Sequence, residues 1–290
     1  MNGIIIADKP SGWTSHDVVA KLRGALKIKR VGHGGTLDPM ATGVLPVLVG
    51  CATRAADLIT GAEKEYVTGL KLGLVTDTQD ITGNVLSNNE TSVTAEELAV
   101  AYTRFLGAQK QTPPMYSAVR HGGKKLYELA RRGIEVPRQQ RDVFISDIEL
   151  LESEGNEFLL RVVCSKGTYI RTLCHDIGAS LGCGGTMSSL RRTRAGAFAI
   201  DIAHTLDEVL DAISSGDAGK VILPIDSLFS EYPPISLAEK ESQRFKNGAA
   251  CSAGNTADGK YRFYSPDGEF LFLGEVKANG IRVIKGFYTQ

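Results

Sequence analysis

The chain has 290 residues, of which 42% are hydrophobic and 23% are charged, and its formal net charge at pH 7 is zero. These values are ordinary for a globular protein, and the length allows one large domain and a small one. The sequence holds no run of about eighteen apolar residues, which excludes a predicted membrane-spanning helix.

The N-terminal part reads as a strand, a helix, a loop and further strands. Residues 3–7 predict a short buried strand that leads into a turn. Ser15 is the expected N-cap of a helix, because apolar residues follow it at helical spacing. After a loop, the sequence predicts an apolar strand at 44–49, a short helix at 52–60 and a strand from Lys64 to Leu72.

The loop at residues 32–46 contains three glycines around His33, followed by a single carboxylate, Asp38, and Pro39. Glycine permits left-handed backbone angles or close approach to a ligand, and Pro39 keeps Asp38 away from helical angles. An acid on such a loop indicates an active site, with an ordinary surface loop as the alternative. The loop matches neither common nucleotide-binding glycine pattern.

In the middle of the chain, Thr94–Glu97 forms a capping box for a helix that runs toward Leu106 and stops at Gly107. A long basic insert then extends from about residue 112 to Arg141. Inserts of this length are usually lids or linkers, and the aromatic and apolar content, with a helix-like stretch at 126–130, favours an ordered lid.

Strands are expected at 143–151 and 158–164, before a helix that starts within 165–173 and ends near Gly182. A second capping box begins at Thr205. Because strands and helices mix without regular alternation, we expect an α+β fold with a mixed sheet rather than a Rossmann type.

Tyr232-Pro233-Pro234 marks an expected boundary between residues 1–231 and 232–290. A helix at 238–246 precedes two hairpins, with turns expected at Asp267-Gly268 and Asn279-Gly280. A small all-β module of this size closes most economically as a barrel.

The cysteines and the N-terminus indicate a cytoplasmic protein. No basic stretch precedes the apolar residues near Met1, so no secretory signal is predicted. The cysteines are odd in number, scattered and without a C-x-x-C motif, which is typical of a reducing compartment and argues against a zinc cage. They are Cys51, Cys164, Cys174, Cys183 and Cys251. We interpret Cys174, His175 and Cys183 as core and helix residues.

Basic residues gather in three stretches although the net charge is zero, and acidic residues gather elsewhere, at 147–157 and 201–217. Such segregation indicates a polyanion-binding surface, although any single stretch could be ordinary solvated surface. The basic residues are Lys21, Arg23, Lys27, Lys29 and Arg30; Arg120, Lys124, Lys125, Arg131, Arg132, Arg138 and Arg141; and Arg191, Arg192 and Arg194.

Residues 32–39 and 41–43, Gly-His-Gly-Gly-Thr-Leu-Asp-Pro and Ala-Thr-Gly, resemble the catalytic motif of the TruB family of tRNA pseudouridine synthases. The resemblance covers nearly the whole chain. It implies the pseudouridine synthase fold, a mixed and largely antiparallel sheet with flanking helices, in residues 1–231. It also implies an RNA-clamping thumb at about 112–141 and a small RNA-binding barrel, a PUA domain, at 232–290.

The resemblance implies that Asp38 is the essential aspartate, that Tyr66 stacks on the target base and that Arg171 pairs with the aspartate. The substrate-binding residues that it implies are Lys9, His33, Lys64, Leu190, Tyr169 and Met115, and the RNA backbone is expected to contact Arg120, Lys124, Lys125, Arg131, Arg132 and Arg141. One departure is Gly34, where many relatives carry Thr or Ser.

The implied reaction converts uridine 55 in the T loop of elongator tRNA to pseudouridine. The base is flipped out, its N1–C1′ bond is broken, the base rotates and it is rejoined through C5. No metal or nucleotide cofactor is needed, and the expected partner is the tRNA T stem-loop, bound by a monomer without guide RNA or membrane. A role in assisting tRNA folding is compatible with this activity.

Three other hypotheses stay open from the sequence. The chain could bind or fold RNA without chemistry, although Asp38, Tyr66 and Arg171 are all present. It could be the catalytic subunit of a guide-RNA-directed particle, although its start close to the catalytic motifs and its lack of long basic tails favour the stand-alone form. It could be a hydrolase with an aspartate nucleophile, which needs a second carboxylate or a metal site. Whether Asp38 attacks the sugar, attacks the base or abstracts a proton also stays open.

Overall fold

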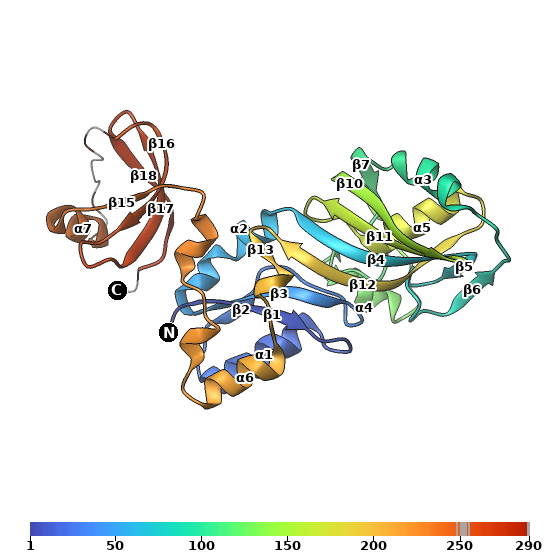
Figure 1. Cartoon of the computed structure of the whole chain (residues 1–290), viewed down its shortest axis with the longest axis horizontal. Coiled ribbons are helices and arrows are strands. Elements are labelled where there is room, and N and C mark those ends of the chain that lie inside the picture. The colour runs from blue at the N-terminus through green and yellow to red at the C-terminus, as the bar shows by residue number, and fades with distance from the viewer. Residues whose placement is uncertain (248, 250–253, 255, 289–290) are drawn as a thin grey trace. The chain divides into compact units, whose positions relative to one another are not determined.

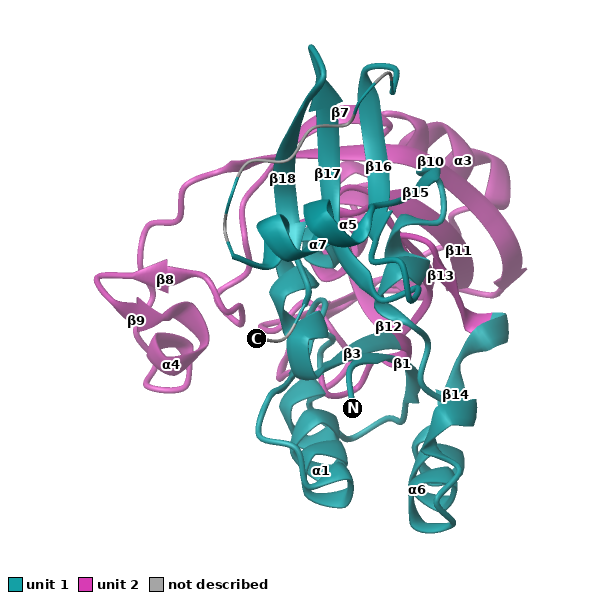
Figure 2. Ribbon diagram, turned by 90° about the vertical axis from the view of Figure 1, so that its left-hand side faces the viewer, with its two compact units in different colours: residues 1–38, 45–60, 201–290 teal, residues 39–44, 61–200 magenta. Residues whose placement is uncertain are grey.

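The structure is a computed structural model that describes residues 1–247, 249, 254 and 256–288 (Figure 1). Its internal contacts divide the chain into two compact units (Figure 2). Unit 1 comprises residues 1–38, 45–60 and 201–290, and unit 2 comprises residues 39–44 and 61–200. Cys251 lies outside the described residues. No helix in the described part of the chain is long and apolar enough to cross a membrane.

Unit 1 holds the N-terminal elements and those after residue 200. Its helices and strands are β1 (Gly3–Lys9), α1 (Ser15–Leu26), β2 (Val31–His33), most of β3 (Thr42–Val49), a 3-10 turn (Gly50–Ala55), most of α2 (Ala56–Gly61), β14 (His204–Thr205), α6 (Leu206–Ser214), two 3-10 turns (Ala218–Lys220 and Ile225–Phe229), β15 (Pro234–Ser236), α7 (Glu239–Lys246), β16 (Gly259–Tyr264), β17 (Phe270–Lys277) and β18 (Gly280–Gly286).

The N-terminal part of unit 1 is a small layer of strands with α1 and α6 packed on it. The strand order is β14-β1-β3, with β1 and β14 parallel and β2 antiparallel to β3. Ile5, Val18, Leu22, Leu45 and Val209 are all fully buried in one cluster between these elements. Each such side chain contributes about 1.5–3 kcal/mol by burial, so this core anchors the strands that flank the glycine loop.

The helix α1 begins one residue earlier than the sequence predicts, because its N-cap is Thr14 and not Ser15. The Thr14 hydroxyl accepts from Asp17 N at 3.1 Å, and the Asp17 carboxylate accepts from Thr14 N at 2.8 Å, which completes a capping box. The Ser15 side chain is instead buried and bonded elsewhere. Lys27 ends the helix in the left-handed conformation, with φ 55°.

The C-terminal part of unit 1 is a four-stranded sheet in the order β15-β16-β17-β18, with α7 packed on it. Its core is aromatic: the ring centroids of Phe263 and Phe272 are 4.5 Å apart, and those of Phe245 and Phe272 are 4.0 Å apart. In the described residues this sheet is open, whereas the sequence predicts a closed barrel.

The last hairpin turns one residue before the expected place. Ala278 and Asn279 have φ values of 48° and 63°, and Gly280 already pairs with Lys277 as the first residue of β18. Two consecutive positive φ values are typical of the turn that connects two strands through two residues, and Asn279 occupies its second position.

Unit 2 holds the elements between residues 61 and 200. They are β4 (Lys64–Leu72), β5 (Leu74–Thr76), β6 (Val85–Asn88), α3 (Ala95–Thr103), β7 (Gly107–Gln111), β8 (Arg120–His121), β9 (Lys124–Lys125), α4 (Leu126–Ala130), β10 (Arg141–Glu154), β11 (Glu157–Cys164), α5 (Ile170–Ser180), β12 (Gly185–Ala195) and β13 (Phe198–Ala199).

The main sheet of unit 2 has the strand order β12-β4-β11-β10-β7, and these strands are antiparallel. The first residues of β3, Thr42 and Gly43, pair in parallel with Arg191 and Arg192 of β12. The sheet is therefore mixed and mostly antiparallel, and with α3 and α5 packed on it (Figure 1) it confirms the expected α+β architecture.

Candidate active site

One face of the unit 2 sheet carries two of the residues that the sequence assigns to the target base. In β4 and β12, Tyr66 stands opposite Arg192 and Thr68 stands opposite Leu190. Side chains of paired residues point to the same face, and so do residues two apart along a strand. Tyr66 and Leu190 are therefore diagonal neighbours on one face, with Tyr66 half-buried and Leu190 8% exposed.

The helix α5 covers this same face. The Thr68 hydroxyl lies 3.9 Å from Cys174 Sγ of α5. Burial raises the pKa of Cys174 to about 12, so its thiol packs as an uncharged group. Arg171 lies in the first turn of α5 and is only 5% exposed. The structure thus brings Arg171 to the face that presents Tyr66 and Leu190.

Arg171 is held by two loops of unit 2. Its Nη1 lies 3.5 Å from Asp80 Oδ2 and donates to Thr78 O at 3.2 Å, and its Nη2 donates to Tyr116 O at 2.8 Å. Both members of the ion pair are buried, which makes their contact strong and costly to break. Tyr116 stands at the start of the basic insert, so Arg171 links the turn after β5 to the base of that insert.

Asp80, which the sequence motifs do not indicate, orients Arg171. Its Oδ1 accepts from the Thr78 hydroxyl at 2.9 Å, from Thr82 N at 3.0 Å and from the Thr82 hydroxyl at 2.5 Å. These bonds aim the other carboxylate oxygen at Arg171. The available signal was an Asp and two Thr residues in a short turn between strands, a composition that also suits any exposed turn.

The glycine loop leaves β2 at His33. Its Nδ1 accepts from Gly35 N at 3.3 Å, and its ring meets that of His16 edge-on, with centroids 5.3 Å apart. A Cβ at Gly34 would lie 2.5 Å from Cγ2 of Ile59, a buried side chain. This chain therefore fills with Ile59 the space that a Thr or Ser side chain at Gly34 would need.

The chain just before Asp38 is fixed by α1. Leu37 N donates to the buried Ser15 hydroxyl at 2.9 Å, and Leu37 is 4% exposed. Asp38 is the last residue of this part of unit 1, and Pro39 begins the segment of unit 2 that runs into β3. Within unit 2, that segment pairs with β12 at Arg191 and Arg192, the residues next to Leu190.

Two lysines assigned to the substrate are buried. Lys9 of unit 1 is fully buried, and its Nζ donates to Pro10 O at 2.9 Å and Trp13 O at 2.6 Å. Lys64 of unit 2 is 5% exposed and donates to Ala62 O. Burial lowers the pKa of Lys64 to about 8, and the charge of Arg192 acts in the same direction. Both ammonium groups are thus directed at backbone carbonyls.

The remaining two assigned residues also lie in unit 2. Tyr169 is the N-cap of α5; its backbone N donates to Gln111 Oε1 at 2.7 Å and its carbonyl accepts from Gln111 Nε2 at 3.0 Å. This pair of bonds ties the start of α5 to the edge strand β7. Met115 is half-buried next to Tyr116.

The basic insert contains a short hairpin, β8 and β9, which the sequence does not predict, followed by the helix α4 at the expected residues 126–130. Leu126 and Leu129 are buried, and two cations contact the ring of Tyr127: Lys125 Nζ and the Arg131 guanidinium are each 5.4 Å from its centroid. Five of the six residues expected to contact phosphates are exposed and Lys125 is half-buried. Within the part of the chain that is described, none of these six forms an ion pair, so their charge is available to a polyanion.

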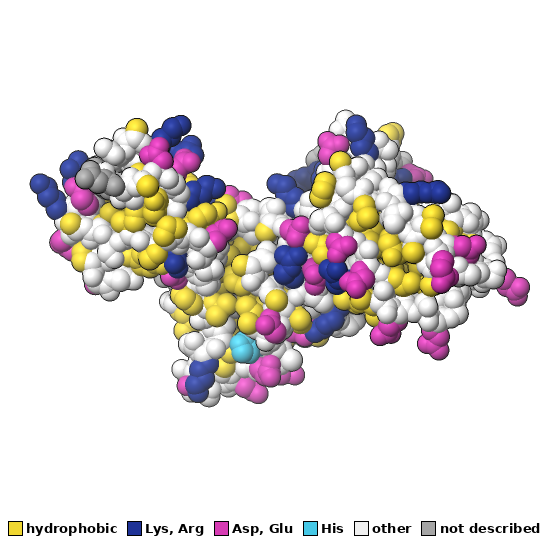
Figure 3. Space-filling model, turned by 45° about the horizontal axis from the view of Figure 1, so that its top comes forward, with side chains coloured by type: hydrophobic (Ala, Val, Ile, Leu, Met, Phe, Trp, Pro, Cys, Tyr) yellow, Lys and Arg dark blue, Asp and Glu magenta, His cyan; other side chains and the backbone are white. Residues whose placement is uncertain are grey.

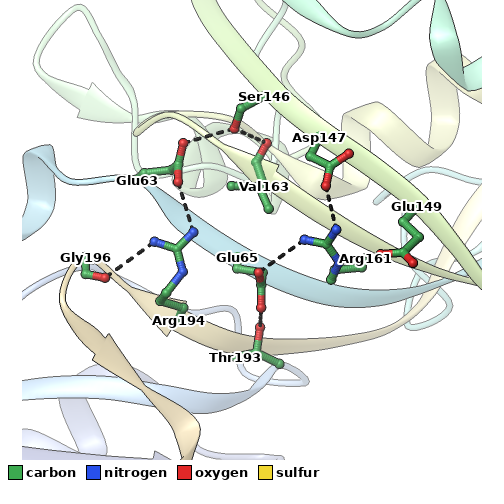
Figure 4. Close-up of polar contacts among 10 residues, drawn as sticks. All are labelled: Glu63, Glu65, Ser146, Asp147, Glu149, Arg161, Val163, Thr193, Arg194 and Gly196. Atoms are coloured by element: carbon green, nitrogen blue, oxygen red, sulfur yellow. Dashed lines mark hydrogen bonds and ion pairs between the residues drawn. The ribbon is translucent and has the colours of Figure 1, made fainter.

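The third basic stretch differs from the expectation of a solvated basic surface. Arg192 is only 1% exposed, and Arg194 pairs with Glu63 at 2.9 Å (Figure 4). On the same side of the sheet as this pair, Arg161 contacts Glu65, Asp147 and Glu149, and these hydrogen bonds raise its pKa. These arginines are buried or neutralised because pairing of the strands brings residues distant in the sequence together, and the linear sequence does not display that pairing.

Acidic and basic side chains are interspersed on the face of the molecule drawn in Figure 3, so neither sign of charge dominates that face. Among the described residues, no group of three or more His, Cys, Asp or Glu side chains is placed to hold a metal ion.

Comparisons with known proteins identify the family of this chain. Residues 23–170 match the family model for the N-terminal domain of TruB family pseudouridylate synthases, and residues 171–230 match that for the C-terminal domain of tRNA pseudouridylate synthase B. The tRNA pseudouridine synthase B of Syntrophomonas wolfei is 43% identical over 281 residues, 95% of this chain and 93% of that protein. That of an Azoarcus species is 42% identical over 290 residues, 100% of this chain and 96% of that protein.

Two solved structures share the fold. One is a chain of an H/ACA ribonucleoprotein bound to a substrate RNA that contains 2′-deoxyuridine, with a TM-score of 0.74 and 28% identity. The other is a chain of a Cbf5–Nop10–Gar1 complex, with a TM-score of 0.75 and 30% identity. Each match covers 99% of this chain and 85% of the other.

Proposed function

The chain belongs to the TruB family of pseudouridylate synthases, and on that basis we propose that it converts uridine 55 in the T loop of elongator tRNAs to pseudouridine. The observation that carries the proposal is the placement of Tyr66, Leu190 and Arg171 at one face of the unit 2 sheet. The substrate is taken from the curated relatives, which are named tRNA pseudouridine synthase B.

The chemistry requires that the target base leave its stack and be read between an aromatic and an apolar group. Tyr66 supplies the aromatic face and Leu190 the apolar one. Tyr169 and Met115 line the substrate site, and His33 occupies the place that the base vacates in the T loop. Lys9 and Lys64 fix backbone carbonyls at the floor of the site, which their observed bonds support.

Asp38 is the carboxylate that the reaction depends on, acting as nucleophile or as base on the flipped uridine. It must be ionised to do either, and a nearby guanidinium favours the ionised form. Arg171 supplies that guanidinium, and its anchoring by Asp80, Thr78 and Tyr116 limits its freedom to move away. The N1–C1′ bond breaks, the base rotates in the site and C5 bonds to C1′. C5 then loses its proton to solvent and N1 takes one up, so substrate and product are isomers.

The RNA backbone is held by the thumb at about 112–141 and by a PUA-like module at 232–290, with residues 1–231 as the catalytic domain. The exposed cations of the thumb support the first assignment. They are Arg120, Lys124, Arg131, Arg132 and Arg141, with Lys125 half-buried beside them. We place the reaction in the cytoplasm and expect a monomer to perform it without guide RNA; assistance to tRNA folding follows from opening the T loop.

The test is to incubate the purified protein alone with an unmodified elongator tRNA transcript and to map pseudouridine at every uridine by carbodiimide modification and primer extension. A transcript with cytidine at position 55 is the matched control. One new stop at position 55, absent from the control, is expected. Tight binding without product would instead favour a folding helper or a guide-dependent enzyme.

A further inference from the structure

Arg192 of β12 faces the site, but it is not one of the groups to which the proposed reaction assigns a role. Arg192 stands opposite Tyr66 on the covered face of the sheet and is the largest of the fully buried side chains, with 1% exposure. It lies close enough to the buried Lys64 for its charge to disfavour the lysine's protonated form. Burying a guanidinium beside another cation costs free energy, and an apolar side chain would fill the same space without that cost.

Arg192 makes a bond that an apolar side chain could not make. Its Nε donates to Val44 O at 2.7 Å, in the segment that runs from Pro39 into β3. The neighbouring Arg191 reaches Thr42 Oγ1 of the same segment with its Nη1, at 3.3 Å. Two consecutive arginines of β12 therefore hold two residues of one short stretch.

The backbone of Arg192 meets this segment as well. Gly43 pairs with Arg192, and a Cβ at Gly43 would lie 2.2 Å from Arg192 O and 2.8 Å from its N. With φ at +98°, Gly43 also has a conformation that favours glycine. Close backbone approach, strand pairing and the guanidinium bond thus fix the segment at one register against β12.

We propose that Arg192 is a positioning residue for catalysis: its bond to Val44 O fixes the segment that follows Asp38 against the strand that carries Leu190, beside Tyr66. The inference rests on the proposed function, because it concerns the placement of the same catalytic groups. Asp38 directly precedes Pro39, the first residue of this segment. Mobility of the segment therefore displaces the Asp38 carboxylate. Misplacement of a reacting group by about 1 Å costs up to about a hundredfold in rate.

Two substitutions separate the bond from the bulk of the side chain. In Arg192→Gln the amide Nε2 takes the place of the arginine Nε, so the donor to Val44 O is kept and the charge is lost. In Arg192→Met a methyl group takes that place, so the donor is lost at similar size. The control is Arg194→Met, two residues along the same strand, which removes an ion pair with Glu63 at the partly exposed surface.

The readouts are the single-turnover rate of pseudouridine formation at saturating enzyme, the tRNA Kd and the thermal unfolding midpoint. Arg192→Met is expected to lower the rate by about ten- to a hundredfold with Kd within about twofold of wild type, and Arg192→Gln to recover it to within about threefold. Arg194→Met is expected to match wild type. Equal rates for the Met and Gln variants, or a loss no larger than that of the control, would overturn the proposal.

A third variant keeps the test decisive if Arg192→Met does not fold. Arg192→Lys retains the charge but moves the donor one atom further along the side chain, so it is expected to turn over more slowly than Arg192→Gln. Equal or faster turnover of the Lys variant would show that charge, and not the bond, matters, and would overturn the inference. Absence of product from the wild-type protein would overturn the proposed function itself.

Discussion

The buried pair of Asp80 and Arg171 allows a sharp test of how the site is held. Their side chains are 7% and 5% exposed, and Asp80 Oδ2 lies 3.5 Å from Arg171 Nη1. Replacing Asp80 with Asn keeps an oxygen that can accept from Thr78 and Thr82, but it turns an NH₂ group toward the guanidinium. The substitution therefore removes the charge from the pair and leaves most of the turn's own hydrogen bonds in place.

The expected size of the effect follows from that difference. A hydrogen bond to a charged group contributes about 1.5–3 kcal/mol, and removing one whole member of a buried ion pair costs about 3–5 kcal/mol. We expect Asp80→Asn to lower the free energy of unfolding by the smaller amount and Asp80→Ala by the larger. Because Arg171 loses one of its anchors, turnover by Asp80→Asn should fall by about ten- to a hundredfold, while the tRNA Kd stays within about threefold.

The assay is single-turnover pseudouridine formation together with chemical denaturation of the same preparations. Asp77→Asn is the matched control, because Asp77 lies on the same turn and bonds Asn84 rather than Arg171. If Asp80→Asn loses stability but turns over within about twofold of Asp77→Asn, the anchoring of Arg171 does not matter for catalysis and the reasoning is wrong.

Three further predictions concern the thumb, a buried lysine and the glycine loop. Changing Arg120 and Lys124 to Gln should make the plot of the log association constant for tRNA against log salt concentration less steep, by about 0.7–0.9 for each phosphate that is no longer neutralised. Binding titrations at several salt concentrations measure this slope. An unchanged slope would show that Arg120 and Lys124 do not contact the RNA backbone. Since Lys64 titrates near 8 when folded and near 10.5 when unfolded, its contribution to stability should rise with pH between these values, by about 3 kcal/mol at most. Denaturation of wild type and Lys64→Met across this range should differ in slope, and parallel curves would refute the shift. Gly34→Thr should cost about 1–3 kcal/mol through overlap with Ile59, and adding Ile59→Ala should recover part of that loss in a double-mutant cycle; strict additivity would contradict the packing.

Much of the fold follows from local patterns. The capping boxes at Thr94 and Thr205 mark the starts of α3 and α6, since their signals lie within four residues of each other. The strand β1 follows from a run of buried apolar residues, and β10 and β11 follow from apolar residues at largely alternating positions. The helix α4 follows from its apolar spacing. The catalytic roles are predicted by resemblance to long family motifs. Residue types and their spacing alone do not distinguish Asp38 from other loop carboxylates.

The features that escaped prediction depend on partners far away in the sequence. The strand β12 was not expected, since Ser189, Arg191, Arg192 and Arg194 read as polar surface; it is a strand because it pairs along its length with β4. Of its arginines, Arg192 becomes buried and Arg194 ion-paired only in the folded sheet. Asp80 is similar, because its role depends on Arg171, which lies 91 positions further along the chain.

The central claim is that this chain forms pseudouridine at position 55 of tRNA through Asp38. The most direct measurement compares wild type with Asp38→Asn on one unmodified elongator tRNA, scoring carbodiimide stops at every uridine and tRNA binding in parallel. We predict a single new stop at position 55 with wild type and none with Asp38→Asn, with a Kd within about threefold because the isosteric amide leaves the RNA contacts in place. Turnover by Asp38→Asn, or wild-type product only at other uridines, would contradict the account.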